Sequence, residues 1–220
     1  MTITLRPGTT VMFTGDSITD SQRLASEDGL GFGYPLRVAG EWGLRHPDRP
    51  VTWLNSAIAG HKVRDLEPRW QADVLDARPD VVSILVGVND MGWHTLDPDG
   101  HVIPAEDFAA GYDRLLAPLA AAGTELILIE PFLLPISGSV KAGDAHVDVA
   151  VRKEWRADLD PKIQVVRELA REYGAHLLAA DGMFAELAAV SGPEYWAADG
   201  VHPTPAGHAA LAAAWLRLVA

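Results

Sequence analysis

The sequence contains no cysteine, so disulfide bridges and thiolate metal sites are excluded along all 220 residues. Long apolar runs are also missing: Val81–Val86 and Leu126–Ile129 are far shorter than the ~20 residues that a membrane-spanning helix needs. Residues 1–10 lack the charged start and the apolar stretch of a signal peptide. These absences predict a cytoplasmic protein with no membrane partner.

Positive charge is scarce. Lysine and arginine together number 18 against 30 aspartates and glutamates, which gives a net charge of −12. An acidic chain repels phosphate backbones and anionic lipid surfaces, so nucleic acid is not an expected partner. Neutral or cationic small molecules are easier to accommodate. The length fits a single domain over residues 1–220, with no linker, repeat or low-complexity segment.

Short apolar runs alternate with longer amphipathic stretches along the chain. Strands are predicted at Thr10–Phe13, Val51–Asn55, Val81–Val86, Glu125–Glu130 and His176–Ala179. Helices are predicted at Val63–Ala77, Phe108–Ala122 and Val149–Tyr173, and from Thr204-Pro205 to the C-terminus, with Gly123 and Gly174 as C-caps. The alternation predicts a three-layer α/β fold with a five-stranded parallel sheet, which binds ligands beyond the carboxyl ends of its strands.

Four signals follow the predicted strands or precede the last helix. Ser17 follows the first strand, Gly60 the second and Asn89 the third, and Asp199 and His202 lie three residues apart before the last helix. Each has an ordinary alternative: a capping serine, a turn glycine, a turn asparagine, and a capping aspartate beside a surface histidine. Together they supply what acyl transfer needs, namely a nucleophile, a base with an orienting carboxylate, and donors for an oxyanion.

These motifs, Gly-Asp-Ser, a glycine, Gly-x-Asn-Asp and Asp-x-x-His in this order, resemble those of the SGNH or GDSL hydrolases. The resemblance runs from residue 11 to about 210. It implies a flavodoxin-like sheet of order 2-1-3-4-5 and a catalytic triad of Ser17, His202 and Asp199. It also implies an oxyanion hole formed by the N–H groups of Ser17 and Gly60 with the Asn89 side chain.

Part of the chain is similar to the acetyl-xylan esterase branch of that family. The similar segments are Val63-Arg64-Asp65-Leu66, Arg69-Trp70 and Pro79-Asp80. This resemblance implies a serine esterase for small acyl esters, with acetylated xylo-oligosaccharides or related sugars as substrate. In that branch we expect a tryptophan directly before the triad acid, but here Ala197-Ala198 precede Asp199 and Trp196 is displaced.

We expect substrate-pocket residues among those near the motif loops. The candidates are Asp16, Trp93, His94 and Trp196. No cofactor and no metal are expected: Asp144, His146 and Asp148 fit a solvated loop better than a metal site, and Gly29-x-Gly31-x-Gly33 lacks dinucleotide spacing. Gly-x-Ser-x-Gly is absent, which argues against the α/β-hydrolase fold.

Two alternatives stay open. One is a thioesterase or lysophospholipase-type acyl hydrolase, and the other is a non-catalytic flavodoxin-like binding module in which the four motifs serve no chemistry. Covalent labelling by an organophosphate separates the module from the enzymes. The sequence leaves open the acyl length, the alcohol part of the substrate, and whether the chain forms a homo-oligomer.

Overall fold

The computed structural model describes residues 2–92, 103–137, 140–142, 145–147 and 149–220. Five strands form one all-parallel sheet in the spatial order β2-β1-β3-β4-β7. They are β1 (Thr10–Gly15), β2 (Thr52–Asn55), β3 (Val81–Leu85), β4 (Glu125–Ile129) and β7 (His176–Leu178). Counted along the chain, this order is 2-1-3-4-5, so the predicted fold class is confirmed.

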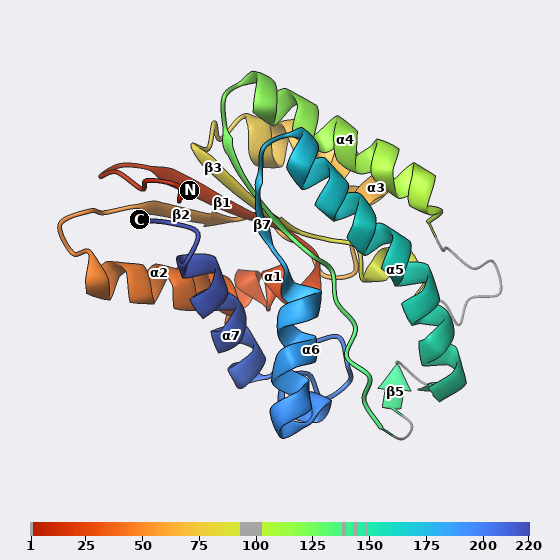
Figure 1. Ribbon diagram of the computed structural model, residues 1–220. Coiled ribbons are helices and arrows are strands. Elements are labelled where there is room, and N and C mark those ends of the chain that lie inside the picture. Colours follow the sequence, from red (N-terminus) through yellow and green to blue (C-terminus); the bar gives the residue numbers. More distant parts are fainter. Residues whose placement is uncertain (1, 93–102, 138–139, 143–144, 148) are drawn as a thin grey trace.

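Helices cover both faces of the sheet (Figure 1). The seven α-helices of the described residues are α1 (Ser17–Asp20), α2 (Tyr34–Arg45), α3 (Val63–Leu66), α4 (Ala105–Ala121), α5 (Val149–Glu172), α6 (Ala180–Ser191) and α7 (Pro205–Leu216). Helices α2, α6 and α7 lie on one face, and α3, α4 and α5 on the other. None of the described helices is both long and apolar enough to cross a membrane.

Each face of the sheet has its own apolar core. Phe13 packs against Tyr34 of α2 and Trp215 of α7 on one face. Val82 belongs to the opposite core, together with Phe108 of α4. Successive strand residues point to opposite faces, so strands buried on both sides need the nearly continuous apolar runs that the sequence contains.

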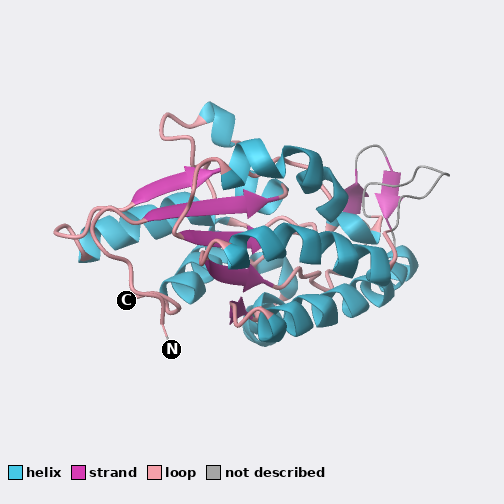
Figure 2. Ribbon diagram, turned by 90° about the horizontal axis from the view of Figure 1, so that it is seen from above, coloured by secondary structure: helices cyan, strands magenta, loops and turns pink. Residues whose placement is uncertain are grey.

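The arrows of the sheet point the same way, and the two termini lie together (Figure 2). A parallel bridge between Ile3 and Val219 joins the terminal segments. The last helix was predicted to reach the C-terminus, and this prediction is wrong because α7 ends at Leu216. The remaining residues pair with the N-terminal segment: the Ala220 N–H donates to the Ile3 carbonyl at 2.8 Å.

The predicted continuous helix over residues 63–77 is also wrong. Helix α3 stops at Leu66, a 3₁₀ turn covers Glu67–Arg69, and a π-helical turn covers Gln71–Leu75. Pro68 lies in the 3₁₀ turn, and proline has no N–H to donate and clashes with the carbonyl four residues before it. The tight turn followed by the wide one leaves Val63, Leu66, Trp70 and Val74 buried in the same core.

Three α-helices and a ribbon appear that the apolar pattern did not predict. They are α1, α2, α6 and the antiparallel pair of β5 (Val140–Ala142) with β6 (Ala145–Val147). Helix α2 could have been predicted from its apolar spacing, because Tyr34, Val38 and Trp42 recur every four residues and all are buried. It packs against α7 and so connects the β1–β2 crossover with the last helix.

Candidate active site

Ser17 begins α1 directly beyond the carboxyl end of β1. Asp16 is the N-cap of this helix, and its Oδ1 accepts a hydrogen bond from the Ile18 N–H at 3.0 Å. Gly15 has φ +141°, and a Cβ there would meet the Leu85 carbonyl oxygen at 1.8 Å. Glycine is therefore required where β1 ends against β3, and this close contact fixes the backbone position of Asp16 and Ser17, which follow.

Ser17, His202 and Asp199 lie in a hydrogen-bonded chain. The Ser17 Oγ is 2.9 Å from His202 Nε2, and His202 Nδ1 is 2.7 Å from Asp199 Oδ2. An ionised carboxylate only accepts hydrogen bonds, so the imidazole proton lies on Nδ1 and Nε2 is left to accept from the Ser17 hydroxyl. Residues 185 positions apart in the sequence are thus brought within hydrogen-bond distance.

The turn that holds Asp199 and His202 orients the carboxylate. Asp199 Oδ1 accepts the backbone N–H groups of Val201 at 2.9 Å and of His202 at 2.7 Å. Gly200 has φ +86° and packs against the Leu134 carbonyl, so the turn needs glycine at this position. The next helix begins soon afterwards at the predicted position, and the Thr204 Oγ1 caps it by accepting a hydrogen bond from the Gly207 N–H.

The pKa values of the pair are shifted in opposite directions. The hydrogen bond to Asp199 raises the pKa of His202 above its ordinary value, although burial of the ring works against this shift. Burial favours a higher pKa for Asp199, but the hydrogen bonds from His202 and Val201 outweigh it, and the net shift of this pKa is downward. Asp199 therefore stays ionised where His202 changes its charge.

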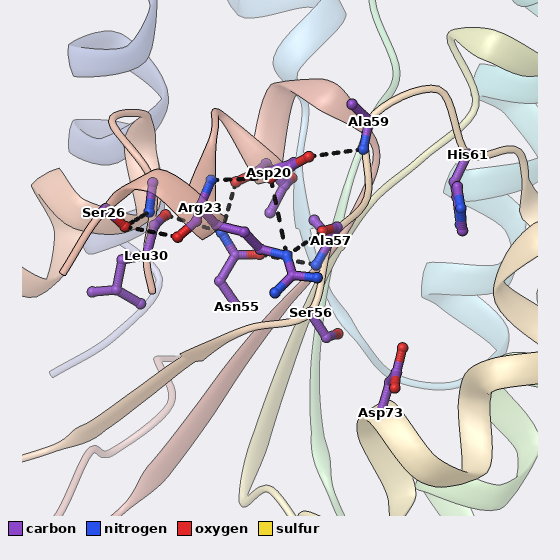
Figure 3. Close-up of polar contacts among 12 residues, drawn as sticks. Asp20, Arg23, Ser26, Leu30, Asn55, Ser56, Ala57, Ala59, His61 and Asp73 are labelled. Atoms are coloured by element: carbon purple, nitrogen blue, oxygen red, sulfur yellow. Dashed lines mark hydrogen bonds and ion pairs between the residues drawn. The ribbon is translucent and has the colours of Figure 1, made fainter. Parts of the chain in front are cut away.

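The loop after β2 carries Gly60 and is held on one side by residues of the Ser17 segment (Figure 3). The Asp20 Oδ2 accepts the Ala59 N–H at 2.9 Å, and the Arg23 Nε donates to the Ala57 carbonyl at 2.5 Å. The Asn55 Oδ1 accepts the Ala57 N–H at 3.0 Å. We call Asp20 and Arg23 the brace. It ties the loop that follows β2 to the segment that follows β1.

Arg69 holds the same loop from the other side. Its Nη1 donates to the Ser56 carbonyl and to Asp73 Oδ2, both at 2.7 Å, and its Nε donates to His61 Nδ1 at 3.3 Å. Within the described part of the chain, the Gly60 N–H between these anchors has no hydrogen-bond acceptor. Gly60 has φ +83°, a backbone conformation that favours glycine.

Asn89 lies in the 3₁₀ turn Asn89–Met91 after β3 and is fully buried. Its Nδ2 donates to the His61 carbonyl at 3.0 Å. An amide nitrogen has two hydrogens, so one remains for another acceptor. Next to it, Asp90 accepts the Val63 N–H at 3.1 Å, and burial raises the pKa of Asp90 to about 7. The Asn-Asp pair therefore joins the turn after β3 to the segment after β2.

Asp16 lies beneath the nucleophile and away from solvent. It is fully buried, and its Oδ2 has no hydrogen-bond partner among the described residues. Burial raises the pKa of Asp16 to about 7, partly offset by the Ile18 N–H and by nearby His202. Asp16, a predicted pocket residue, is therefore buried and is not one of the residues that line the cleft, but its charge raises the pKa of His202.

A cleft of about 340 Å³ opens over Ser17 and His202. Its described walls are Ser17, Ile18, Asp20, Ser21, Gln22, Ala59, His202, Pro203 and His208. Trp196 is not one of these residues: its indole N–H donates to the Ser191 Oγ at 2.9 Å, and its ring packs beside Tyr195. Trp93 and His94 lie outside the described residues.

The fold brings four polar residues to this site that were not predicted from the sequence as site residues. They are Asp20, Arg23 and His208, and also Arg69, which was named only within a segment similar to the acetyl-xylan esterase branch. Asp20 had a usable signal, because a residue three positions after Ser17 in a short helix returns to the same side. His208 is one of the few polar residues on an alanine-rich helix, but only the fold shows that it faces the cleft. The Asp144, His146 and Asp148 group lies outside the side chains that the structure describes.

Comparison with known families adds an independent finding. The model of the GDSL-like lipase/acylhydrolase family matches residues 13–210. The chain belongs to this family. Acetylxylan esterase of Geobacillus stearothermophilus is 31% identical over 219 residues, covering 96% of this chain and 93% of the relative. Membership of an acylhydrolase family, with this relative, makes the chain a carboxylic ester hydrolase.

Solved structures of family relatives have the same fold. The acetylxylan esterase Axe2 from the same organism superimposes with a TM-score of 0.82 at 30% identity, covering 97% of this chain and 94% of that chain. A protein of Parabacteroides merdae, described as a GDSL-like lipase, reaches 0.86 at 29% identity over 99% and 98% of the two chains. The agreement extends over nearly the whole length of each chain.

Catalytic mutants of Axe2 have also been solved. They replace a serine, an aspartate and a histidine with alanine, and that aspartate and histidine are three positions apart. A further Axe2 mutant replaces a tryptophan directly before the aspartate. Asp199 and His202 have the same spacing here, but Ala198 occupies the position before Asp199. The departure expected from the sequence therefore lies beside the triad candidates.

Proposed function

We propose that this esterase removes small acyl groups, acetyl foremost, from sugar esters such as acetylated xylo-oligosaccharides. Ser17 is the nucleophile, His202 the general base and acid, and Asp199 the residue that orients His202. The observation that carries the proposal is the unbroken chain from Ser17 Oγ through His202 to Asp199, with distances of 2.9 and 2.7 Å, on the wall of an open cleft.

In the first half-reaction, the Ser17 oxygen attacks the ester carbonyl carbon while its proton passes to His202 Nε2. The tetrahedral intermediate collapses when the carbon–oxygen bond to the alcohol breaks, and His202 gives its proton to the departing oxygen. In the second half, His202 takes a proton from water, and the hydroxide attacks the acyl-Ser17 carbonyl. The acid leaves, and Ser17 regains its proton from His202.

The negative charge that develops on the carbonyl oxygen needs nearby donors. We assign this role to the N–H groups of Ser17 and Gly60 and to the second hydrogen of the Asn89 amide. Support comes from the hydrogen bonds already present: neither backbone N–H has an acceptor in the described part of the chain, and Asn89 uses one of its two hydrogens on the His61 carbonyl. The brace and Arg69 hold the loop that presents Gly60.

The acetyl-sugar assignment has its support in the cleft and in the relatives. Polar side chains, among them Asp20, Gln22 and His208, line a volume of about 340 Å³. Such walls suit the hydroxyl groups of a sugar better than a long acyl chain. The 31% identical relative is named for acetylxylan. Ala198, directly before Asp199, has a much smaller side chain than tryptophan, so we expect relaxed selection among acetylated sugars.

Replacing Ser17 with alanine tests the mechanism. Turnover of 4-nitrophenyl acetate should fall by at least ~10³-fold, because the triad members act as a unit. A fluorophosphonate should add its mass to the wild-type chain at Ser17 and not to Ser17→Ala. As a matched control, Ser191→Ala, at the end of α6, should keep wild-type turnover and labelling. Equal activity of Ser17→Ala and wild type would refute the assignment.

A substrate panel tests the acyl and alcohol preferences. The enzyme should release acetate from acetylated xylo-oligosaccharides and prefer 4-nitrophenyl acetate to the octanoate. A clear preference for octanoyl esters, lysophospholipids or acyl thioesters would favour the lipid or thioester alternative while leaving the triad in place. Failure of all substrates together with failure of labelling would favour the non-catalytic module.

A further inference from the structure

A second histidine lies on the wall of the cleft. His208 is on the first turns of α7, lines the same cleft as Ser17 and His202, and is not part of the proposed triad. Its Nδ1 accepts the Tyr34 backbone N–H at 3.2 Å. A backbone N–H can only donate, so Nδ1 carries no proton, and the neutral ring must carry its hydrogen on Nε2.

The surroundings keep this ring neutral. Burial lowers the pKa of His208 to about 4, and the positive charges of Arg37 and of protonated His202 act in the same direction. His208 therefore stays uncharged throughout the range in which His202 must be neutral for catalysis. Its Nε2–H is a fixed donor, and no residue of the described chain accepts it.

The position of the leaving group follows from the proposed mechanism. The alcohol oxygen must lie close to His202 Nε2, because that atom gives it a proton. His208 lies near enough to His202 to feel its charge, and both line the cleft with Ser21 and Gln22. Ser21 is a neighbour of His208, because a Cβ placed on Gly33 would meet the Ser21 Cβ at 2.8 Å and the His208 Cε1 at 3.0 Å. Ser21 and Gln22 both have left-handed backbones, with φ of +40° and +62°, which are uncommon for residues other than glycine.

We propose that the wall formed by His208, Ser21 and Gln22 is the subsite for the alcohol part of the substrate, and that the His208 Nε2–H donates a hydrogen bond to a hydroxyl oxygen there. This inference rests on the proposed function, because it takes the position of the leaving group from the His202 proton transfer. The ligand class is a polyhydroxy alcohol such as a sugar ring.

His208 also has a purely structural use. Gly33, the N-cap of α2, has no side chain to satisfy the first N–H groups of that helix, and His208 Nδ1 supplies an acceptor for one of them. Two substitutions separate the roles. In His208→Asn, the amide oxygen replaces Nδ1 as acceptor and the distal donor is lost. In His208→Gln, the longer amide keeps a donor near the Nε2 position and gives up the contact to Tyr34.

The experiment compares two acetyl esters on each variant. Acetylated xylobiose has hydroxyl and ether oxygens in its alcohol part, whereas 4-nitrophenyl acetate has no hydroxyl group. For His208→Asn, kcat/KM on acetylated xylobiose should fall ~10-fold more than on 4-nitrophenyl acetate, the loss expected for one hydrogen bond of ~1.4 kcal/mol. The loss should appear in KM, since the bond forms with bound substrate as well as in the transition state. His208→Gln should keep the wild-type ratio of the two substrates and melt at a lower temperature.

His176→Asn is the matched control, because His176 begins β7 at the opposite edge of the sheet. Its ratio of the two substrates should equal that of the wild type. Equal losses on both substrates for His208→Asn, or a changed ratio in His176→Asn, would overturn the subsite. No hydrolysis of either ester by the wild-type enzyme would instead refute the proposed function, so the two failures are distinguishable.

Discussion

At the scale of single residues, the proposed mechanism makes the reaction of Ser17 depend on the charge of His202. Only the neutral ring accepts the Ser17 proton, and the hydrogen bond to Asp199 raises the pKa of His202. Protonation removes the base, so a raised pKa moves the loss of activity to higher pH. We expect the acidic limb of kcat/KM to have its midpoint above the ordinary histidine pKa of 6.5.

Replacing Asp199 with asparagine tests this dependence. The variant should lose ~10⁴-fold in kcat, because the amide no longer holds His202 in the required tautomer. Its remaining activity should titrate at lower pH than that of the wild type, because the main cause of the raised pKa is gone. Steady-state rates from pH 5 to 9 give both results, with Glu186→Gln on the exposed face of α6 as control. An unshifted acidic limb would mean that a group other than His202 titrates.

Also at the scale of single residues, substitutions of Asn89 can distinguish a structural role of this side chain from a catalytic one. Asn89→Ala should lower kcat by ~10²–10³-fold with little change in KM, because charge on the carbonyl oxygen develops only as Ser17 attacks. Asn89→Asp keeps the size of the side chain and removes the donor, so it should lose as much. Kinetics and a thermal melt are measured on both variants. A lower melting temperature with kcat preserved would show that Asn89 acts only structurally, through its hydrogen bond to the His61 carbonyl.

At the scale of the elements, the loop after β2 is held by charged side chains of its neighbours. Asp20 and Arg23 come from the segment after β1 and Arg69 from the turn after α3. The donors and acceptors of this loop are thereby fixed before a substrate arrives. Fixed dipoles stabilise a developing charge without reorganising, so under the proposed mechanism the brace contributes to catalysis by holding the loop in place.

The brace predicts a kinetic effect of Asp20→Ala. Losing the acceptor of the Ala59 N–H should free the Gly60 loop and lower kcat by ~10-fold, less than the loss of a whole oxyanion donor. The melting temperature should fall by only ~2–4 °C, the effect of about 1 kcal/mol in a chain of this size. Asp160→Ala, which removes an exposed ion pair with Arg156 on α5, is the control and should leave kcat unchanged. Wild-type kcat in Asp20→Ala would show that the loop holds its shape without the brace.

The five strands could be predicted from the sequence, whereas the contacts of the brace could not. Apolar runs predicted all five strands of the sheet, because strands buried on both faces leave a strong local pattern. Ser17 and His202 could be paired by motif, but the contact of Asp20 with Ala59 depends on how two crossover loops meet. Pro68 divided one predicted helix, whereas Pro118 and Pro161 lie inside α4 and α5 without ending them. Whether a proline ends a helix or lies inside it depends on tertiary packing, which the local sequence pattern does not show.

At the scale of the whole molecule, two carboxyl groups lie buried under the carboxyl edge of the sheet. Asp16 and Asp90 are both fully buried, and burial raises the pKa of each to about 7. The folded chain therefore keeps protons that the unfolded chain loses near pH 4. Folded stability from these groups is fully present at low pH and is lost as the pH rises toward 7.

Asp16→Asn tests this linkage, because asparagine can still cap α1 through the Ile18 N–H and has no proton to lose. The free energy of unfolding of the variant should equal that of the wild type at pH 4 and exceed it by ~1–4 kcal/mol at pH 8, since one pKa unit is worth about 1.4 kcal/mol. Urea unfolding at pH 4, 5.5, 7 and 8 measures this difference in free energy. In the control Asp48→Asn, at an exposed position, the difference from the wild type should be the same at every pH. Asp16 also raises the pKa of His202, so the acidic limb of activity should move to lower pH in the same variant. A variant that is less stable than the wild type at pH 8 would mean that the molecule stabilises Asp16 as a carboxylate.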